Sequence, residues 1–418
     1  MSAIMRVFLL CCAAAVLCLT ATGCWNRTEL NELGITVATG FDRSGNDWEI
    51  SYQIVVPSAT GTSQGGGGGG GGGSQPSVTV FTTKGKTIRE AAAFGYVENP
   101  RRLYFGHTEV TVIGKEAAEA GINEILDLYF RNVEARETVL IAVTDRKASD
   151  ILRNMVPPEK MPGSALADIM HKQQSNTSYF PVINLFQLAQ KISSDSQAAG
   201  VPAISVPEGG EKSLESLDIN KTTSPPVKMK IVRLGVFKGD RLAGWLNREQ
   251  SYGIAWLTGQ IKGSTLSFAC PRSDPQSNLG GSLRINKAKT KVTPVKAGNH
   301  YKMKVRIQAS GDLLEYMCGG DPFNPKTIQA IEREVGATII DTVNTGWEAA
   351  QTMRVDLPGF AGKIHRKDPK AWKELKDNWD EELAKIELEV HVTVKIERPG
   401  LLKKSFKQLS NKNGPHGG

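Results

Sequence analysis

The chain has 418 residues, of which 40% are apolar, 22% are charged and 7% are aromatic, so it is not disordered as a whole. At roughly 150 residues per domain, this length predicts two or three domains. The formal net charge is +8, but the bases are scattered among nearly as many acids, so we do not expect a nucleic-acid-binding protein.

The N-terminus has the pattern of an export signal. Arg6 precedes 13 apolar residues from Val7 to Leu19, which are too few to span a bilayer. Small residues then precede Cys24, as in the lipobox of bacterial lipoproteins, although Ala21 departs from the usual leucine. An ordinary secretory signal with a chance cysteine is the alternative. The polar residues that follow Cys24 favour lipidation, because they do not continue a membrane helix.

The sequence therefore predicts a lipoprotein signal peptide at residues 1–23 and a diacylglyceryl group on the Cys24 thiol. Two acyl chains are sufficient for stable anchoring, so we expect the mature chain on the outer face of a membrane. Cys270 and Cys318 are the other two cysteines left after processing. They could form a disulfide, but a chain with large cores does not need one, and buried free cysteines are favoured here.

The first domain is expected at residues 24–158 and mixes strands with helices. Nine consecutive glycines interrupt it, and residues 57–77 around them predict a disordered loop, because glycine loses much entropy on ordering. Apolar and β-branched runs predict strands at 35–41, 48–56, 78–82, 103–113 and 138–144. Helical spacing predicts helices at 87–96 and 116–131, with a short third helix that ends near Met155.

A middle domain is expected at 159–262, a C-terminal α+β domain at 263–405 and a flexible tail at 406–418. A tight turn at Lys238-Gly239-Asp240 predicts a hairpin in the middle domain. Strands near 264–269, 282–295 and 300–318 predict an antiparallel meander. Asn324 and Pro325 begin a long helix with one apolar stripe, a second helix follows at 369–382, and residues 386–396 alternate as a strand. The fold class is α+β, with mixed and antiparallel sheets packed with helices.

The motifs of common chemistry are weak in this chain. Lys84-Gly85-Lys86-Thr87 is best explained as a turn followed by a helix cap, and His107 as a half-buried strand residue. The basic run from Lys363 to Lys367 is expected to be a solvated face. Ligand spacings for metals and nucleophile motifs are missing, so we expect no catalytic residues, cofactor or metal.

Several motifs, taken in order, carry a resemblance to a known family. The motifs are Cys24-Trp25-Asn26-Arg27 with Glu29-Leu30-Asn31, Gly40-Phe41-Asp42, Leu103 to His107, Val236 to Asp240 with Gly244-Trp245-Leu246, and Ile364-His365-Arg366 with Trp372 and Trp379-Asp380. Together they resemble the Ger(x)C lipoproteins, the C subunits of spore nutrient germinant receptors. The resemblance covers residues 20 to about 405.

This resemblance implies a non-catalytic, three-domain α+β receptor subunit on the outer face of the spore inner membrane. It implies partnership with an A subunit and an integral membrane B subunit, and a requirement for germination triggered by nutrients. Of the family's residues only Cys24, the acylation site, carries over with a role. Whether this subunit contacts the nutrient directly or indirectly is left open. A lipid-anchored solute-binding protein of a transporter is the main alternative, and an extracytoplasmic hydrolase is a weaker one.

Overall fold

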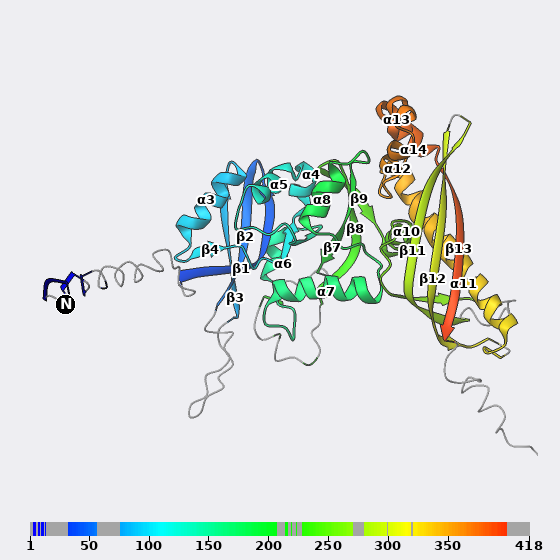
Figure 1. Cartoon of the computed structure of the whole chain (residues 1–418), viewed down its shortest axis with the longest axis horizontal. Helices are drawn as coiled ribbons and strands as arrows, with labels where there is room; N and C mark the ends of the chain where they lie inside the picture. Colours follow the sequence, from blue (N-terminus) through cyan, green and yellow to red (C-terminus); the bar gives the residue numbers. More distant parts are fainter. Residues whose placement is uncertain are drawn as a thin grey trace, which may run out of the picture.

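The structure, a computed structural model, describes residues 32–56, 76–206, 228–270, 280–298, 300–318 and 321–398, with isolated positions in 3–13 and 214–223. Cys24, the glycine run and the predicted tail at 406–418 lie outside these residues. The described part contains two separate sheets with helices packed on them (Figure 1). The α+β fold class is thereby confirmed.

The first sheet has nine strands and is mixed. Its order is β3-β2-β1-β5-β6-β7-β8-β9, and β4 pairs separately with β1. The pairs β1–β4, β1–β5, β5–β6 and β6–β7 are parallel, and the other neighbours are antiparallel. The strands are β1 (Leu33–Ser44), β2 (Asp47–Val55), β3 (Val78–Gly85), β4 (Arg102–Tyr104), β5 (Val110–Ile113), β6 (Leu140–Val143), β7 (Ala198–Ser205), β8 (Lys230–Lys238) and β9 (Arg241–Leu246).

The strand pairing between the two halves of this sheet is minimal. The pairing of β6 with β7 consists of one registered pair, Val143 with Ala203. Strands β1–β6 belong to the expected domain at 24–158, whereas β7–β9 belong to the expected middle domain at 159–262. The two groups of strands share one sheet, and the domain boundaries remain a prediction.

Helices cover both faces of the first sheet. One face packs against α3 (Ile88–Glu98), α4 (Lys115–Ala120), α5 (Asn123–Phe130) and α8 (Leu185–Ile192). The other packs against α6 (Ala148–Arg153) and α7 (Pro162–Asn176). The strands predicted at 35–41 and 48–56 are confirmed as β1 and β2, which form an antiparallel hairpin. Its turn contains Gly45, whose φ of 64° suits a residue without a Cβ.

Two elements in this half differ from the sequence prediction. The helix expected at 116–131 is two helices, α4 and α5, because Gly121 adopts a φ of 124° that ends the first one. The strand expected at 103–113 is also divided, into β4 and β5. His107 lies in the turn between them and is exposed, so its assignment to a half-buried strand position was wrong.

The second sheet contains β10 (Ser264–Phe268), β11 (Gly281–Ala297), β12 (His300–Tyr316) and β13 (Glu387–Arg398), in that order. The antiparallel meander β10-β11-β12 is confirmed, and β13 adds in parallel to β12. Helix α11 (Pro325–Thr352) packs along this sheet through its apolar stripe, and α10 (Arg248–Leu257) packs against α11 (Figure 1). The Asn324 cap is confirmed, since its side chain accepts a hydrogen bond from the Lys326 backbone N–H.

The predicted helix at 369–382 is not continuous. It consists of α13 (Pro369–Leu375), a 3₁₀ turn (Lys376–Asn378) and α14 (Trp379–Ala384), and α12 (Phe360–Lys367) precedes it. Trp372 and Trp379 are both buried, with ring centroids 5.2 Å apart. The apolar face was therefore read correctly, but the tighter turn between the two tryptophans was missed.

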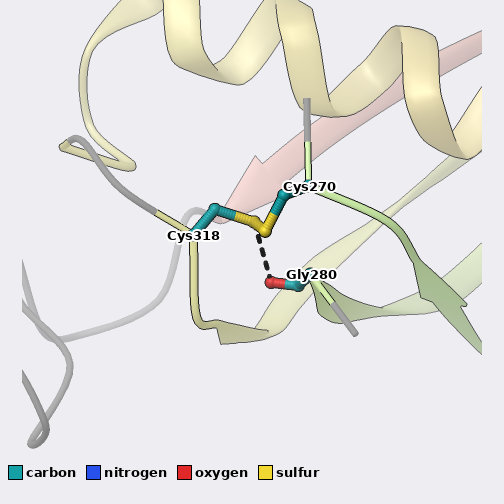
Figure 2. The surroundings of a disulfide bond; sticks show 3 residues. All are labelled: Cys270, Gly280 and Cys318. Carbon is teal, nitrogen blue, oxygen red and sulfur yellow. Dashed lines mark hydrogen bonds between the residues drawn. A yellow bond between two sulfur atoms is a disulfide. The ribbon is translucent and has the colours of Figure 1, made fainter. Parts of the chain in front are cut away.

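Cys270 and Cys318 form a disulfide, so the expectation of free cysteines was wrong (Figure 2). Strand register explains the pairing: Gly281 of β11 lies opposite Phe268 of β10 on one side and Tyr316 of β12 on the other. The two cysteines follow these strand ends by two residues each, and their Cα atoms are 5.5 Å apart. The Gly280 carbonyl oxygen lies 3.1 Å from the Cys318 sulfur.

Candidate functional site

The predicted lipidation site cannot be placed on the fold, because Cys24 lies outside the described residues. The nearest strand is β1, which begins at Leu33. None of the described helices is both long and apolar enough to cross a membrane. Lipidation of Cys24 thus stays a prediction from the sequence.

A pocket between the first sheet and its helices is the best candidate for a binding site in the described part of the chain. It has a volume of about 320 Å³ and lies between β1 and β2 on one side and helices α3 and α5 on the other. Pockets that bind small molecules are of this size, with mostly apolar walls and a few polar groups. The apolar and aromatic lining residues are Phe41, Ile50, Tyr52, Ala92, Ala93, Tyr96, Phe105, Leu128, Tyr129 and Ala135.

Three hydroxyls form a closed cluster beside this pocket. Tyr129 Oη lies 2.6 Å from both Thr39 Oγ1 and Thr111 Oγ1, and the two threonine oxygens are 2.9 Å apart. Tyr129 and Thr39 also line the pocket. In such a ring each hydroxyl donates to the next, so the remaining lone pairs face outward as acceptors. Burial raises the pKa of Tyr129, which therefore stays protonated at neutral pH.

Charged side chains gather where the pocket opens to solvent. Arg131 Nε lies 2.7 Å from Asp127 Oδ1, and Arg89 Nη2 lies 3.6 Å from Asp127 Oδ2. The hydrogen bond from Arg131 holds the pKa of Asp127 below its usual range, and Arg89 adds to the effect. Two guanidinium groups thus share one carboxylate, and the mouth carries a net positive charge. Both arginines line the pocket together with Asn132.

The structure also places the other residues that the sequence had singled out. Thr87 caps α3 by accepting a hydrogen bond of 3.1 Å from the Glu90 backbone N–H, so its assignment as a helix cap is confirmed. His107 lies against Tyr104, with ring centroids 5.7 Å apart. Among the described residues, no group of three His, Cys, Asp or Glu side chains could hold a metal ion.

The basic run at 363–367 lies on α12 and is only partly a free solvated face. The His365 ring lies 2.9 Å from Asp195, and Lys367 donates to the Pro294 carbonyl at 2.5 Å. Burial is the main reason that the pKa of Lys363 is lowered. These contacts hold α12 against two distant parts of the chain, so the run has a structural use.

The pocket could not be predicted from the sequence. Its residues come from two strands and two helices, and Thr39 is separated from Tyr129 by 90 positions. Each of these side chains belongs to an ordinary apolar pattern when read along the chain. Only the packing of α3 and α5 over β1 and β2 brings them around one cavity.

Two known domain families together match most of this chain. Residues 26–206 match the spore germination protein N-terminal domain, and residues 233–400 match the spore germination B3/GerAC-like C-terminal domain. Spore germination protein KC of Bacillus subtilis (strain 168) is 28% identical over 404 residues, which cover 93% of this chain and 96% of that protein. Spore germination protein GerQC of Bacillus cereus is 23% identical over 322 residues, which cover 77% and 83%.

A solved structure shares the fold. The crystal structure of the GerBC protein superposes with a TM-score of 0.52 at 16% identity, and the match covers 87% of this chain and 98% of that one. At this level of identity the likeness concerns the arrangement of helices and strands alone.

Proposed function

Since this chain belongs to the GerAC-like family of spore germination proteins, also called the Ger(x)C family, we propose that it is the C subunit of a nutrient germinant receptor. The observation that carries the proposal is the ordered match of both family domains, which together run from residue 26 to residue 400. In this proposal the subunit acts with an A subunit and a B subunit, both membrane proteins, and all three are required for germination in response to nutrients.

We propose that the subunit is held by a diacylglyceryl group on Cys24 at the outer face of the spore inner membrane. The lipobox before Cys24 and the short apolar stretch from Val7 to Leu19 support this location. Two acyl chains are enough to make such an anchor stable. The first strand that the structure describes, β1, begins nine positions after the proposed anchor.

The subunit is proposed to be non-catalytic. A general acid or base works best when its pKa lies near the working pH. At the pocket, the pKa of Tyr129 is raised further by burial and the pKa of Asp127 is lowered by its two arginines. Both pKa values are thereby shifted further from neutral pH. Such groups suit binding or a structural role better than proton transfer.

The alternative of a solute-binding protein for a transporter has less support. Such proteins hold their ligand between two similar α/β lobes. Here the two sheets differ in strand number and order, with nine mixed strands in one and four in the other. A small ligand would instead bind in the pocket between the first sheet and the helices α3 and α5.

The test is a Cys24→Ala substitution in the sporulating organism. We expect the protein to move from the membrane fraction to the soluble fraction, and the spores to lose most of their response to the nutrient. Cys18→Ala is the matched control, because Cys18 is predicted to leave with the signal peptide. Normal germination together with soluble Cys24→Ala protein would contradict the proposal.

A further inference from the structure

The open face of the second sheet carries a concentrated positive charge. Helix α11 packs on one face of this sheet (Figure 1). Side chains of the other face are exposed or half-exposed along β11, β12 and β13. Strand register places fifteen positions of this face in five rows across the three strands. Seven of the fifteen are lysine or arginine and two are glutamate, which leaves a net charge of +5.

The two acids among these fifteen positions lie in the two rows at one end. The row of Val295, Lys302 and Glu387 contains an ion pair of 2.6 Å between Lys302 and Glu387. In the next row Lys304 lies 3.4 Å from Glu389. These rows follow the usual rule that opposite charges face each other on neighbouring strands.

The other three rows contain no carboxylate. They are Lys291–Arg306–His391, Lys289–Gln308–Thr393 and Lys287–Ser310–Lys395, and we call them the basic rows. None of their four lysines or Arg306 forms an ion pair within the described part of the chain, and all five are exposed. Lys291 and Arg306 are direct antiparallel partners, an arrangement of like charges that destabilises a sheet.

This contrast within one sheet needs a cause outside the sheet. The chain places glutamates opposite lysines in two rows, yet it leaves five cations unpaired in the three rows beside them. An external anionic surface would remove the repulsion between Lys291 and Arg306. It would also have to be broad, because the basic rows span three strands.

We propose that the basic rows dock on the anionic lipid headgroups of the membrane. Lysine and arginine near an anionic bilayer each add to binding, and the attraction falls off within a Debye length. The face carries no large apolar side chain in the basic rows, so it would rest on the headgroups without inserting. The inference rests on the proposed membrane location, and it adds a second contact point far along the chain from Cys24.

The test uses the chain from residue 24 onward with Cys24→Ser, which contains every strand from β1 to β13 and carries no lipid. We expect it to sediment with vesicles that contain phosphatidylglycerol at low ionic strength and to be released by added salt. It should not sediment with vesicles of phosphatidylcholine alone. Because this chain is not anchored, the outcome is independent of the Cys24→Ala experiment on germination.

Charge variants locate the contact. Lys289→Glu with Lys291→Glu should weaken vesicle binding by about thirtyfold or more. The matched control, Lys370→Glu with Lys373→Glu on α13, makes the same change of net charge at exposed positions outside the basic rows and should weaken binding much less. Equal losses in both variants would overturn the proposal, and so would unchanged binding in the first.

A gain of binding excludes misfolding as the explanation. Glu387→Gln with Glu389→Gln removes the two acids of the five rows and should strengthen binding to the phosphatidylglycerol vesicles. No binding to these vesicles at low salt would also overturn the proposal. In that case an acidic protein surface would be the occupant to consider.

Discussion

Gly253 of α10 and Gly346 of α11 lie against each other with their backbones in contact. A Cβ added to Gly253 would lie 2.7 Å from the Gly346 backbone and 2.1 Å from the Thr342 carbonyl oxygen. Such distances do not occur at real Cβ atoms, so the two helices cross here only because both residues lack a side chain. This crossing joins the end of the expected middle domain to the long helix of the C-terminal domain.

Alanine at this crossing should therefore be destabilising. We expect Gly346→Ala to lower the free energy of unfolding by about 1–3 kcal/mol, because the helices must separate to admit the methyl group. Gly336→Ala in the same helix is the matched control: nothing lies within 4 Å of its added Cβ, and alanine favours helix by about 1 kcal/mol. Urea unfolding should show a lower free energy of unfolding for Gly346→Ala and a higher one for Gly336→Ala, each relative to the wild type. A change of the same sign in both variants would contradict the close contact between Gly253 and Gly346.

Asp356 predicts a dependence of stability on pH. Its carboxylate accepts hydrogen bonds from the Phe360 and Ala361 backbone N–H groups and from the Ser196 hydroxyl, at 2.7–2.8 Å. Burial nevertheless raises the pKa of Asp356 from 3.8 to about 6. The folded state thus binds a proton more tightly than the unfolded state, and stability should rise as pH falls from about 7 to 4. The gain is up to about 3 kcal/mol.

Asp356→Asn should remove this part of the pH profile. The variant loses an acceptor for buried N–H groups, so it should also be less stable at pH 4 by about 1–3 kcal/mol. Thermal unfolding between pH 4 and pH 7 measures both effects. Asp377→Asn at an exposed position should keep the wild-type slope. If Asp356→Asn kept the wild-type dependence of stability on pH, another group would be responsible for that dependence.

Removing one hydroxyl from the cluster beside the pocket is expected to change the stability of the fold. Tyr129→Phe removes one of its three hydroxyls and leaves Thr39 and Thr111 paired at 2.9 Å. We expect a loss of about 1–2 kcal/mol in the free energy of unfolding. Tyr96→Phe at the exposed edge of the pocket should change it by less than about 0.5 kcal/mol. Denaturant titration distinguishes the two, and equal effects would mean that the cluster contributes nothing.

The disulfide is expected to contribute to stability by restricting the unfolded chain. Its cysteines are separated by 48 positions, and a loop of this size predicts about 4 kcal/mol. Cys270→Ala with Cys318→Ala should lower the midpoint of thermal unfolding, and a reductant should lower that of the wild type similarly. The double variant should not respond to reductant. Two thiols blocked without reduction, detected by mass, would disprove the bridge.

Much of the architecture was readable from local patterns. The stripe from Ile331 to Trp347 predicted the buried face of α11, and the alternation at 386–396 predicted β13. The failures have one physical origin, which is that local patterns do not report φ angles or partners in space. A helical spacing continues through Gly121 although its φ of 124° ends the helix, and only strand register brings Cys270 to Cys318.

Among the functional features, a local motif could be predicted from the sequence, whereas sites formed by distant elements could not. Cys24 was predicted from its neighbours in the chain and lies outside the described residues. The pocket of Thr39 and Tyr129 and the basic rows around Lys291 depend on which elements become neighbours. Lysines at the alternate positions 287, 289 and 291 of β11 look like the solvent-exposed face of an ordinary strand. Only the register shows that Arg306 lies opposite Lys291.

The single residue pair between β6 and β7 also has a mechanical meaning. Strand pairing in the first sheet consists of several residue pairs at every other boundary between β3 and β9, but of Val143 and Ala203 alone at this one. The sheet is therefore weakest along this line. If the proposed anchor holds the chain near β1 while α10, which follows β9, stays packed against α11, a pull between these two points would act across this seam.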